Sequence, residues 1–205
     1  DGDRLIAVDE RGNELTGDHI LAILTRFMKD RGLLKNDMVI ITPMSNFGLR
    51  VAFDELGIRH EDADVGDRNV LELMQKRGAV LGGEQSGHVI FLDHHTTGDG
   101  IITALQLLAV LQESGRKLSD LASIMKLSPQ KTINVPVRDK PPLEGLPALQ
   151  KAIADASAEL GRKGRVLVRY SGTQLLCRVM VEGPDEATTV RLANGLADIV
   201  RTQAG

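Results

Sequence analysis

Residues 38–42 read MVIIT, and this short stretch decides the fold class. A continuous apolar run of strand length is typical of a strand buried on both faces of a sheet. After it, the sequence predicts a helix at residues 47–56, a strand at 58–64 and another helix at 69–77. This alternation of helix and strand predicts a three-layer α/β domain with a mixed sheet.

The segments on either side of MVIIT extend this pattern. Residues 5–8 form an expected strand that leads into a hairpin turn, and Asp18 is the expected N-cap of a helix that ends at Gly32. A strongly apolar helix is expected from residue 101 to about 113. Ser119 is the expected N-cap of the short helix after it.

A proline-rich connection at residues 131–147 leads into a second, smaller domain. Two strands joined directly and flanked by helices predict an α+β domain with an antiparallel sheet. Its expected strands are 133–137, 166–170 and 177–182, and its expected helices are 146–160 and 186–202. The predicted domains are therefore residues 17–130 and 131–205.

The composition of the 205 residues excludes several classes of protein. A net charge of −3, with the 25 Lys and Arg spread along the chain, argues against nucleic-acid binding by phosphate neutralisation. No apolar run approaches the length of a membrane helix, which takes about 18 residues. The single cysteine, Cys177, cannot form an internal disulfide, so we expect a cytoplasmic protein. The chain begins at Asp1 inside an apparent loop, and we expect it to be a piece of a longer protein.

Two carboxylates flank a glycine in Asp1-Gly2-Asp3, and Arg4 follows them. Such a pair can converge on one hard cation, because the glycine lets the backbone turn tightly between the two side chains. Aspartate and glycine are also the commonest turn residues, so an ordinary turn is the alternative interpretation.

Residues 79–93, AVLGGEQSGHVIFLD, hold a polar turn between two apolar strands. A hairpin needs only a short glycine-containing turn, whereas this one also carries Glu84, Gln85, Ser86 and His88. Their hydrogen-bonding groups suit a polyhydroxylated ligand such as a sugar. A hairpin turn with solvated side chains is the alternative.

Residues 166–183, VLVRYSGTQLLCRVMVEG, form two expected strands and the polar loop between them. An arginine fork, two hydroxyls and free backbone N–H groups can surround a phosphate. The residues that provide these groups are Arg169, Ser171, Gly172 and Thr173. The alternative is a Ser-Gly turn beside a surface arginine.

Three other features have simpler interpretations. His94 and His95 would point to opposite faces of a strand, so a metal ion shared by the two is not expected. Asp99 is a candidate helix cap. Cys177 begins an apolar strand and is expected in the core rather than as a nucleophile.

In this order, the three polar stretches resemble the α-D-phosphohexomutase superfamily. Gln85 and His88 match the turn of its bacterial branch that acts on glucosamine phosphates. Members have four domains, and the resemblance places residues 1–16 at the end of the second domain. The whole third and fourth domains follow, so the chain would be about the C-terminal half of a member.

The resemblance implies a role for each stretch. Asp1 and Asp3 would be two of the three aspartates in a Mg²⁺ loop, with Arg4 in a supporting role in catalysis. The implied substrate-binding residues of the third domain are Glu84, Gln85, Ser86 and His88, together with Asp67 and Arg68 in the segment VGDR. Those of the fourth domain are Arg169, Ser171, Gly172 and Thr173.

The implied activity is the interconversion of glucosamine 6-phosphate and glucosamine 1-phosphate through glucosamine 1,6-bisphosphate. The phosphoserine that this chemistry needs lies in the first domain, so the chain alone is expected to be inactive. The resemblance implies a phosphosugar as the partner, with neither nucleic acid nor membrane, and a homodimer for the full-length protein. The alternatives are a phosphoglucomutase or phosphomannomutase, or a non-catalytic phosphosugar-binding module.

One departure from the family concerns the phosphate loop. Its usual Glu-Pro pair is replaced here by Gln174 and Leu175. This removes a carboxylate and a residue that stiffens the turn.

Overall fold

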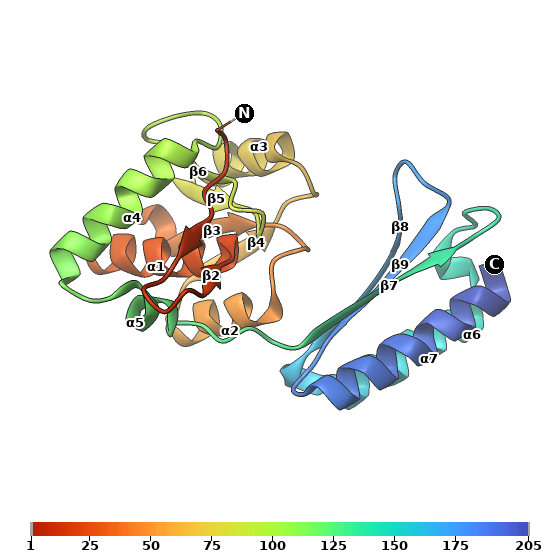
Figure 1. Ribbon diagram of the computed structural model, residues 1–205. Helices are drawn as coiled ribbons and strands as arrows, with labels where there is room; N and C mark the ends of the chain where they lie inside the picture. Colours follow the sequence, from red (N-terminus) through yellow and green to blue (C-terminus); the bar gives the residue numbers. More distant parts are fainter. Residues whose placement is uncertain (1, 205) are drawn as a thin grey trace. The chain divides into compact units, whose positions relative to one another are not determined.

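The computed structural model describes residues 2–204 and divides the chain into two compact units (Figure 1). The first unit ends at Leu127 and the second begins at Ser128. None of the helices in residues 2–204 combines the length and the apolarity needed to cross a bilayer.

A four-stranded mixed sheet, ordered β4-β3-β5-β6, forms the centre of the first unit. Strand β3 pairs in parallel with β4 and β5, and β6 is antiparallel to β5. The strands are β3 (Met38–Ile41), β4 (Arg59–Asp62), β5 (Leu81–Gly83) and β6 (Val89–Phe91). The mixed α/β sheet expected from the sequence is therefore confirmed.

Helices cover both faces of this sheet, because β3 buries side chains on both. Val39 and Ile41 pack in the cluster that contains α1, α2, α4 and α5, whereas Ile40 packs in the cluster that contains α3. All three side chains are fully buried. The helices are α1 (Gly17–Asp30), α2 (Phe47–Glu55), α3 (Asp67–Arg77), α4 (Gly100–Ser114) and α5 (Leu118–Ala122), with a 3₁₀ turn η1 at Lys35–Asp37.

Two of the three expected helix caps are wrong. Helix α1 has its N-cap at Thr16, and Asp18 lies buried in the first turn, where its carboxylate accepts the Asn46 N–H at 2.9 Å. Helix α5 starts after Lys117, and Ser119 instead hydrogen-bonds Glu10. Asp99 is confirmed as the cap of α4, because its Oδ1 accepts two backbone N–H groups at 2.8 and 2.9 Å.

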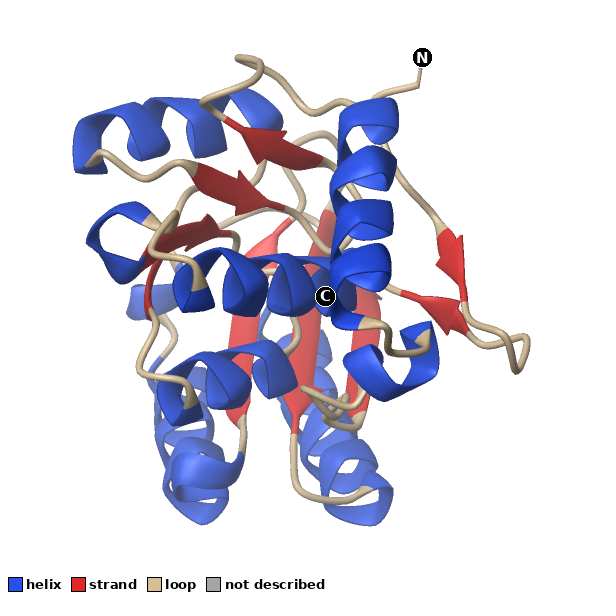
Figure 2. Ribbon diagram, turned by 90° about the vertical axis from the view of Figure 1, so that its left-hand side faces the viewer, coloured by secondary structure: helices blue, strands red, loops and turns tan. Residues whose placement is uncertain are grey.

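The expected hairpin at the start of the chain is present. Strands β1 (Ala7–Val8) and β2 (Glu14–Leu15) pair antiparallel, apart from the four-stranded sheet (Figure 2). The Asp9 carboxylate closes the turn by accepting hydrogen bonds from Arg11 and Asn13. These bonds, chiefly those from Asn13, lower the pKa of Asp9.

The second unit is a three-stranded antiparallel sheet, ordered β7-β9-β8, with two helices packed along one face (Figure 1). Cys177 and the alternate residues of β9 form the core beneath these helices, as expected. Burial raises the pKa of the Cys177 thiol. The elements are β7 (Gln130–Pro136), β8 (Arg165–Tyr170), β9 (Leu176–Glu182), α6 (Pro147–Leu160) and α7 (Glu186–Ala204), with 3₁₀ turns η2 (Leu143–Gly145) and η3 (Gly161–Lys163).

The edge strand β4 gives a pH-dependent prediction. His60 lies against Phe53, with ring centroids 5.8 Å apart, and burial followed by the charge of Arg50 lowers the pKa of His60. A histidine with a lowered folded pKa binds its proton more readily in the unfolded chain. The contribution of neutral His60 to the stability of the first unit is therefore fully present above pH about 6.5. This contribution is lost as the pH falls below that value. Urea unfolding between pH 7.5 and 5 should show a smaller loss of stability in His60→Gln than in the parent chain.

Candidate functional site

Three loops of the first unit follow the carboxyl ends of parallel strands, at one end of the sheet. Because β3, β4 and β5 are parallel, their carboxyl ends lie together. Ligands of open α/β sheets bind outside the carboxyl ends of the strands. The loops that follow these strands are residues 42–46, 63–66 and 84–88. The candidate sugar-binding turn is therefore at the end of the sheet where a ligand is expected.

Hydrogen bonds between backbone groups close the turn at residues 84–88. The Glu84 N–H donates to the His88 carbonyl at 2.9 Å, and the Gly87 N–H donates to the Glu84 carbonyl at 3.1 Å. Gly87 has φ +87°, a left-handed conformation that favours glycine. The polar insertion is thus a defined hairpin turn between β5 and β6, as the sequence predicts.

Two other segments of backbone pack tightly against this turn. The Gly17 N–H at the start of α1 donates to the Gln85 carbonyl at 2.9 Å, and the Leu5 N–H donates to the Gly87 carbonyl at 3.0 Å. A Cβ at Gly17 would lie 2.3 Å from the Glu84 carbonyl oxygen. The backbone of the turn is therefore held on both sides.

Glu84 connects the turn to the segment before α3. Its Oε1 accepts the Gly66 N–H at 3.2 Å. The neighbouring residues Asp67 and Arg68 lie exposed in the first turn of α3, where Arg68 pairs with Glu72 at 2.8 Å. The structure therefore brings Glu84 to the backbone of the VGDR segment and leaves the two charged side chains of that segment in solvent.

Ser86 has a buried hydroxyl oxygen with no hydrogen-bonding partner in the described part of the chain. A buried polar atom without a partner is rare, because its desolvation is not compensated. The Ser86 hydroxyl therefore lies at the carboxyl end of the sheet with its hydrogen-bonding capacity unused among the described residues.

His88 uses both ring nitrogens within the protein. Nε2 accepts the Gly98 N–H at 3.1 Å, so this nitrogen carries no proton, and Nδ1–H faces the Asp3 carboxylate at 3.3 Å. The ring is only 4% exposed, and a Cβ at Gly98 would lie 2.5 Å from it. This differs from the expected direct sugar contact, because no ring nitrogen of His88 is left for a substrate.

Of the two expected metal ligands, Asp3 is described by the structure and Asp1 lies outside the described residues. The Asp3 carboxylate lies 3.9 Å from Arg4 Nε and is 41% exposed. Hydrogen bonding by its own backbone, and then by His88, lowers the pKa of Asp3. No three His, Cys, Asp or Glu side chains within residues 2–204 are grouped so that they could hold a metal ion.

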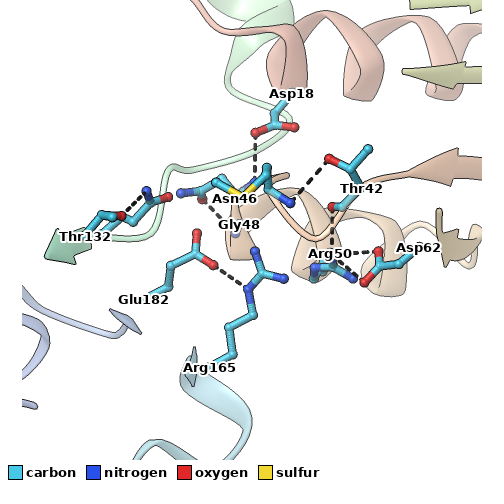
Figure 3. Close-up of polar contacts among 11 residues, drawn as sticks. Asp18, Thr42, Asn46, Gly48, Arg50, Asp62, Thr132, Arg165 and Glu182 are labelled. Carbon is cyan, nitrogen blue, oxygen red and sulfur yellow. Dashed lines mark hydrogen bonds and ion pairs between the residues drawn. The ribbon is translucent and has the colours of Figure 1, made fainter. Parts of the chain in front are cut away.

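A set of polar residues at the same end of the sheet, of which Asp18 and Asn46 are buried, was not predicted from the sequence. Asn46 caps α2 through its Oδ1, which accepts the Gly48 N–H at 2.9 Å, and Asp18 accepts the Asn46 N–H (Figure 3). Arg50 donates to the Thr42 carbonyl and to Asp62 in the same close-up. Asp18 is separated by 28 residues from Asn46, so local periodicity could not reveal the contact.

The candidate phosphate loop of the second unit joins β8 to β9. The Ser171 N–H donates to the Leu176 carbonyl at 2.8 Å, and Ser171 Oγ accepts the Gln174 N–H at 3.3 Å. Ser171 is 4% exposed, whereas Gly172 and Thr173 lie in solvent. The loop is closed at its base and presents its tip to solvent.

An arginine that the sequence analysis did not select lies beside Arg169. In the β8–β9 register Arg169 is directly opposite Arg178, so both side chains lie on the same face. The buried Nε of Arg178 has no partner among the described residues. Like charges directly opposite one another on neighbouring strands are destabilising. Correct pairing of the two strands from sequence would have revealed this residue.

The histidine pair is not on a strand, which corrects the reason given for excluding a shared metal. His94 and His95 lie in a turn after β6, where both backbone N–H groups donate to the Phe91 carbonyl. His94 Nε2 lies 3.2 Å from Gln106 Nε2, and His95 Nδ1 accepts the Thr97 N–H.

Comparison with known proteins identifies the family. Residues 16–127 match the model of the phosphoglucomutase/phosphomannomutase alpha/beta/alpha domain III, and residues 133–199 match the model of the C-terminal domain of the same family. The chain belongs to the phosphoglucomutase/phosphomannomutase family. This confirms the resemblance drawn from the three polar stretches.

Curated members of this family are similar along the whole chain. The phosphoglucosamine mutase of Syntrophobacter fumaroxidans is 57% identical over 205 residues, which are 100% of this chain and 46% of that protein. The phosphoglucosamine mutase of Syntrophus aciditrophicus is 53% identical with the same coverage. The chain thus spans about half the length of the curated relatives it matches.

Several solved structures share the fold of this chain. Aspergillus fumigatus N-acetylphosphoglucosamine mutase, in complex with GlcNAc-6P and magnesium, has a TM-score of 0.81 at 21% identity, covering 98% of this chain and 50% of that one. A variant of that enzyme in complex with glucose 1,6-bisphosphate has a TM-score of 0.79 at 21% identity and covers 98% and 47%. A Burkholderia thailandensis family protein has a TM-score of 0.75 at 21% identity, with 100% and 46% covered.

Proposed function

We propose that this chain forms the sugar-binding and phosphate-binding part of a phosphoglucosamine mutase. That enzyme is an isomerase, which interconverts glucosamine 6-phosphate and glucosamine 1-phosphate through glucosamine 1,6-bisphosphate. The observation that carries the proposal is the 57% identity, over all 205 residues, to a relative with that name. The serine that carries the phosphoryl group would belong to the part of the relatives that this chain does not span.

The phosphate anchor is the loop between β8 and β9. Arg169 and Arg178 provide two guanidinium groups on one face, and guanidinium groups bind phosphate through charge-assisted hydrogen bonds. The Ser171 hydroxyl proton and the exposed Gly172 and Thr173 complete the proposed set.

The sugar clamp is the turn at residues 84–88. Glu84 has one carboxylate oxygen on Gly66 N–H, and its other oxygen is the proposed acceptor for sugar hydroxyls. Ser86 and Gln85 are further proposed contacts, and Asp67 and Arg68 stay candidates at the exposed start of α3. For His88 we propose a positioning role, because its ring connects Asp3 to Gly98.

The proposed Mg²⁺ site fits this chain only in part. Magnesium prefers carboxylate and other oxygen ligands, and Asp3 offers an exposed carboxylate of this kind. We propose Asp1 as a second ligand and Arg4 as a supporting residue, with further ligands from outside residues 2–204. When bound, the ion would offset the charge of the transferring phosphoryl group. A homodimer and a cytoplasmic location of the whole protein are also part of the proposal.

Substrate preference tests the proposed function. A protein of the relatives' length that contains this chain should give a higher kcat/KM with glucosamine 1-phosphate than with glucose 1-phosphate or mannose 1-phosphate. A wide preference for glucose or mannose phosphate would instead favour a phosphoglucomutase or phosphomannomutase.

A substitution in the sugar clamp gives a sharper prediction. Glu84→Gln keeps the size of the side chain but removes a charged acceptor, which should lower kcat/KM by about ten- to a hundredfold, since a hydrogen bond to a charged group contributes about 1.5–3 kcal/mol. Steady-state kinetics of the same protein would measure this loss. Glu113→Gln is the matched control, because Glu113 pairs with Arg31 on the exposed surface of α4. Normal kinetics in Glu84→Gln would remove this residue from the clamp.

A further inference from the structure

The segment after β7 is attached to the phosphate loop at two points. The Val137 N–H donates to the Leu175 carbonyl at 3.1 Å, which continues the β7–β9 pairing beyond Pro136. Three residues later, Lys140 Nζ donates to the Ser171 carbonyl at 2.6 Å. The loop at residues 171–176 is therefore held from outside β8 and β9 at both of its ends.

Lys140 contacts the residue that organises the loop. Ser171 uses its N–H to close the base of the loop and its Oγ to accept the Gln174 N–H. The Lys140 ammonium donates to the third polar group of Ser171, which is its carbonyl oxygen. With all three groups engaged, Ser171 is fixed, and the exposed Gly172 and Thr173 form the free tip.

The Lys140 ammonium also places a positive charge on the loop. Residues 171–176, SGTQLL, carry no charge of their own. Among residues 2–204, the structure gives this exposed ammonium the Ser171 carbonyl as its hydrogen-bonding partner. A positive charge close to a loop that is proposed to bind a dianion favours that binding.

We propose that Lys140 is a positioning residue for phosphate recognition, which holds the Ser171 carbonyl and adds a cation behind the loop. The proposal rests on the proposed function of this loop. It extends the phosphate site from β8 and β9 to the segment that follows β7.

Calorimetric titration of the 205-residue chain with glucosamine 6-phosphate tests the role in binding. Lys140→Met should weaken binding about five- to tenfold, because it removes a charged hydrogen-bond donor, and Lys140→Arg should stay within about twofold of the parent. Arg138→Met, which removes a neighbouring exposed cation, is the matched control and should also stay within about twofold. Parent-like binding by Lys140→Met, or an equal loss in Arg138→Met, would overturn the proposal.

Amide hydrogen exchange tests the positioning role without relying on affinity. In Lys140→Met the Ser171 and Gln174 amides, which close the loop, should exchange at least about tenfold faster than in the parent chain, while Lys140→Arg restores their protection. Unchanged exchange in Lys140→Met would contradict the role. Failure of the proposed function gives a different result: Arg169→Ala binds the sugar phosphate as the parent does, or the parent does not bind it.

Discussion

Replacing Arg169 with alanine is expected to raise the KM for glucosamine 1-phosphate about ten- to a hundredfold in a protein of the relatives' length. The guanidinium is proposed to make charge-assisted hydrogen bonds to phosphate, and loss of such bonds costs about 1.5–3 kcal/mol. Arg169 also lies opposite Arg178, so removing it leaves one cation where the structure places two. Steady-state kinetics over a range of substrate concentrations would measure the change.

Arg162→Ala is the control for the Arg169 variant. Arg162 is an exposed arginine in the η3 turn, so its loss changes the net charge equally without touching the loop. Its kinetics should match those of the parent. An unchanged KM in Arg169→Ala, or an equal rise in both variants, would contradict the assignment of the phosphate anchor.

The second large effect is expected from Gly17→Ala, which should destabilise the first unit by about 1–3 kcal/mol. Its new Cβ would lie 2.3 Å from the Glu84 carbonyl oxygen and 2.5 Å from the Gly87 nitrogen, and both are backbone atoms that cannot turn aside. The start of α1 must then move away from the turn, and the Gly17 N–H loses the Gln85 carbonyl. Urea unfolding followed by circular dichroism would measure the lost stability.

Gly195→Ala is the matched glycine substitution, and its effect should have the opposite sign. Gly195 lies exposed within α7, and within the described part of the chain no atom outside the adjacent backbone of that helix lies within 4 Å of a Cβ built there. Alanine favours a helix interior over glycine by about 0.5–1 kcal/mol, so this variant should be slightly more stable than the parent. A Gly17→Ala chain as stable as the parent would show that the turn does not depend on close packing against α1.

The sequence predicted most helices and strands because their side-chain spacing is a local property. The apolar run at residues 38–42 needed no knowledge of its neighbours to indicate a strand buried on both faces. The cap of α1 was missed because Asp18 hydrogen-bonds Asn46, and a favourable residue type alone does not show which partner it finds.

The candidate site was predictable in its residue types but less so in their roles. Glu84 and Ser171 were selected from the polar loops that hold them. The hydrogen bonds of the His88 ring depend on Asp3, which lies 85 positions away in the sequence, and on Gly98. The backbone of Gly98 reaches the ring because this residue has no Cβ. Arg178 was missed because its proximity to Arg169 follows from the strand register.

The central claim is that the two polar loops of this chain recognise a phosphosugar. Mapping of backbone amide chemical shifts on the labelled 205-residue chain, titrated with glucosamine 6-phosphate and separately with glucosamine, tests it most directly. With glucosamine 6-phosphate, we expect shifts at residues 171–174 and further shifts at residues 84–88. With glucosamine, we expect no shifts at residues 171–174. Shifts confined to other parts of the chain, or identical shifts with both ligands, would contradict it.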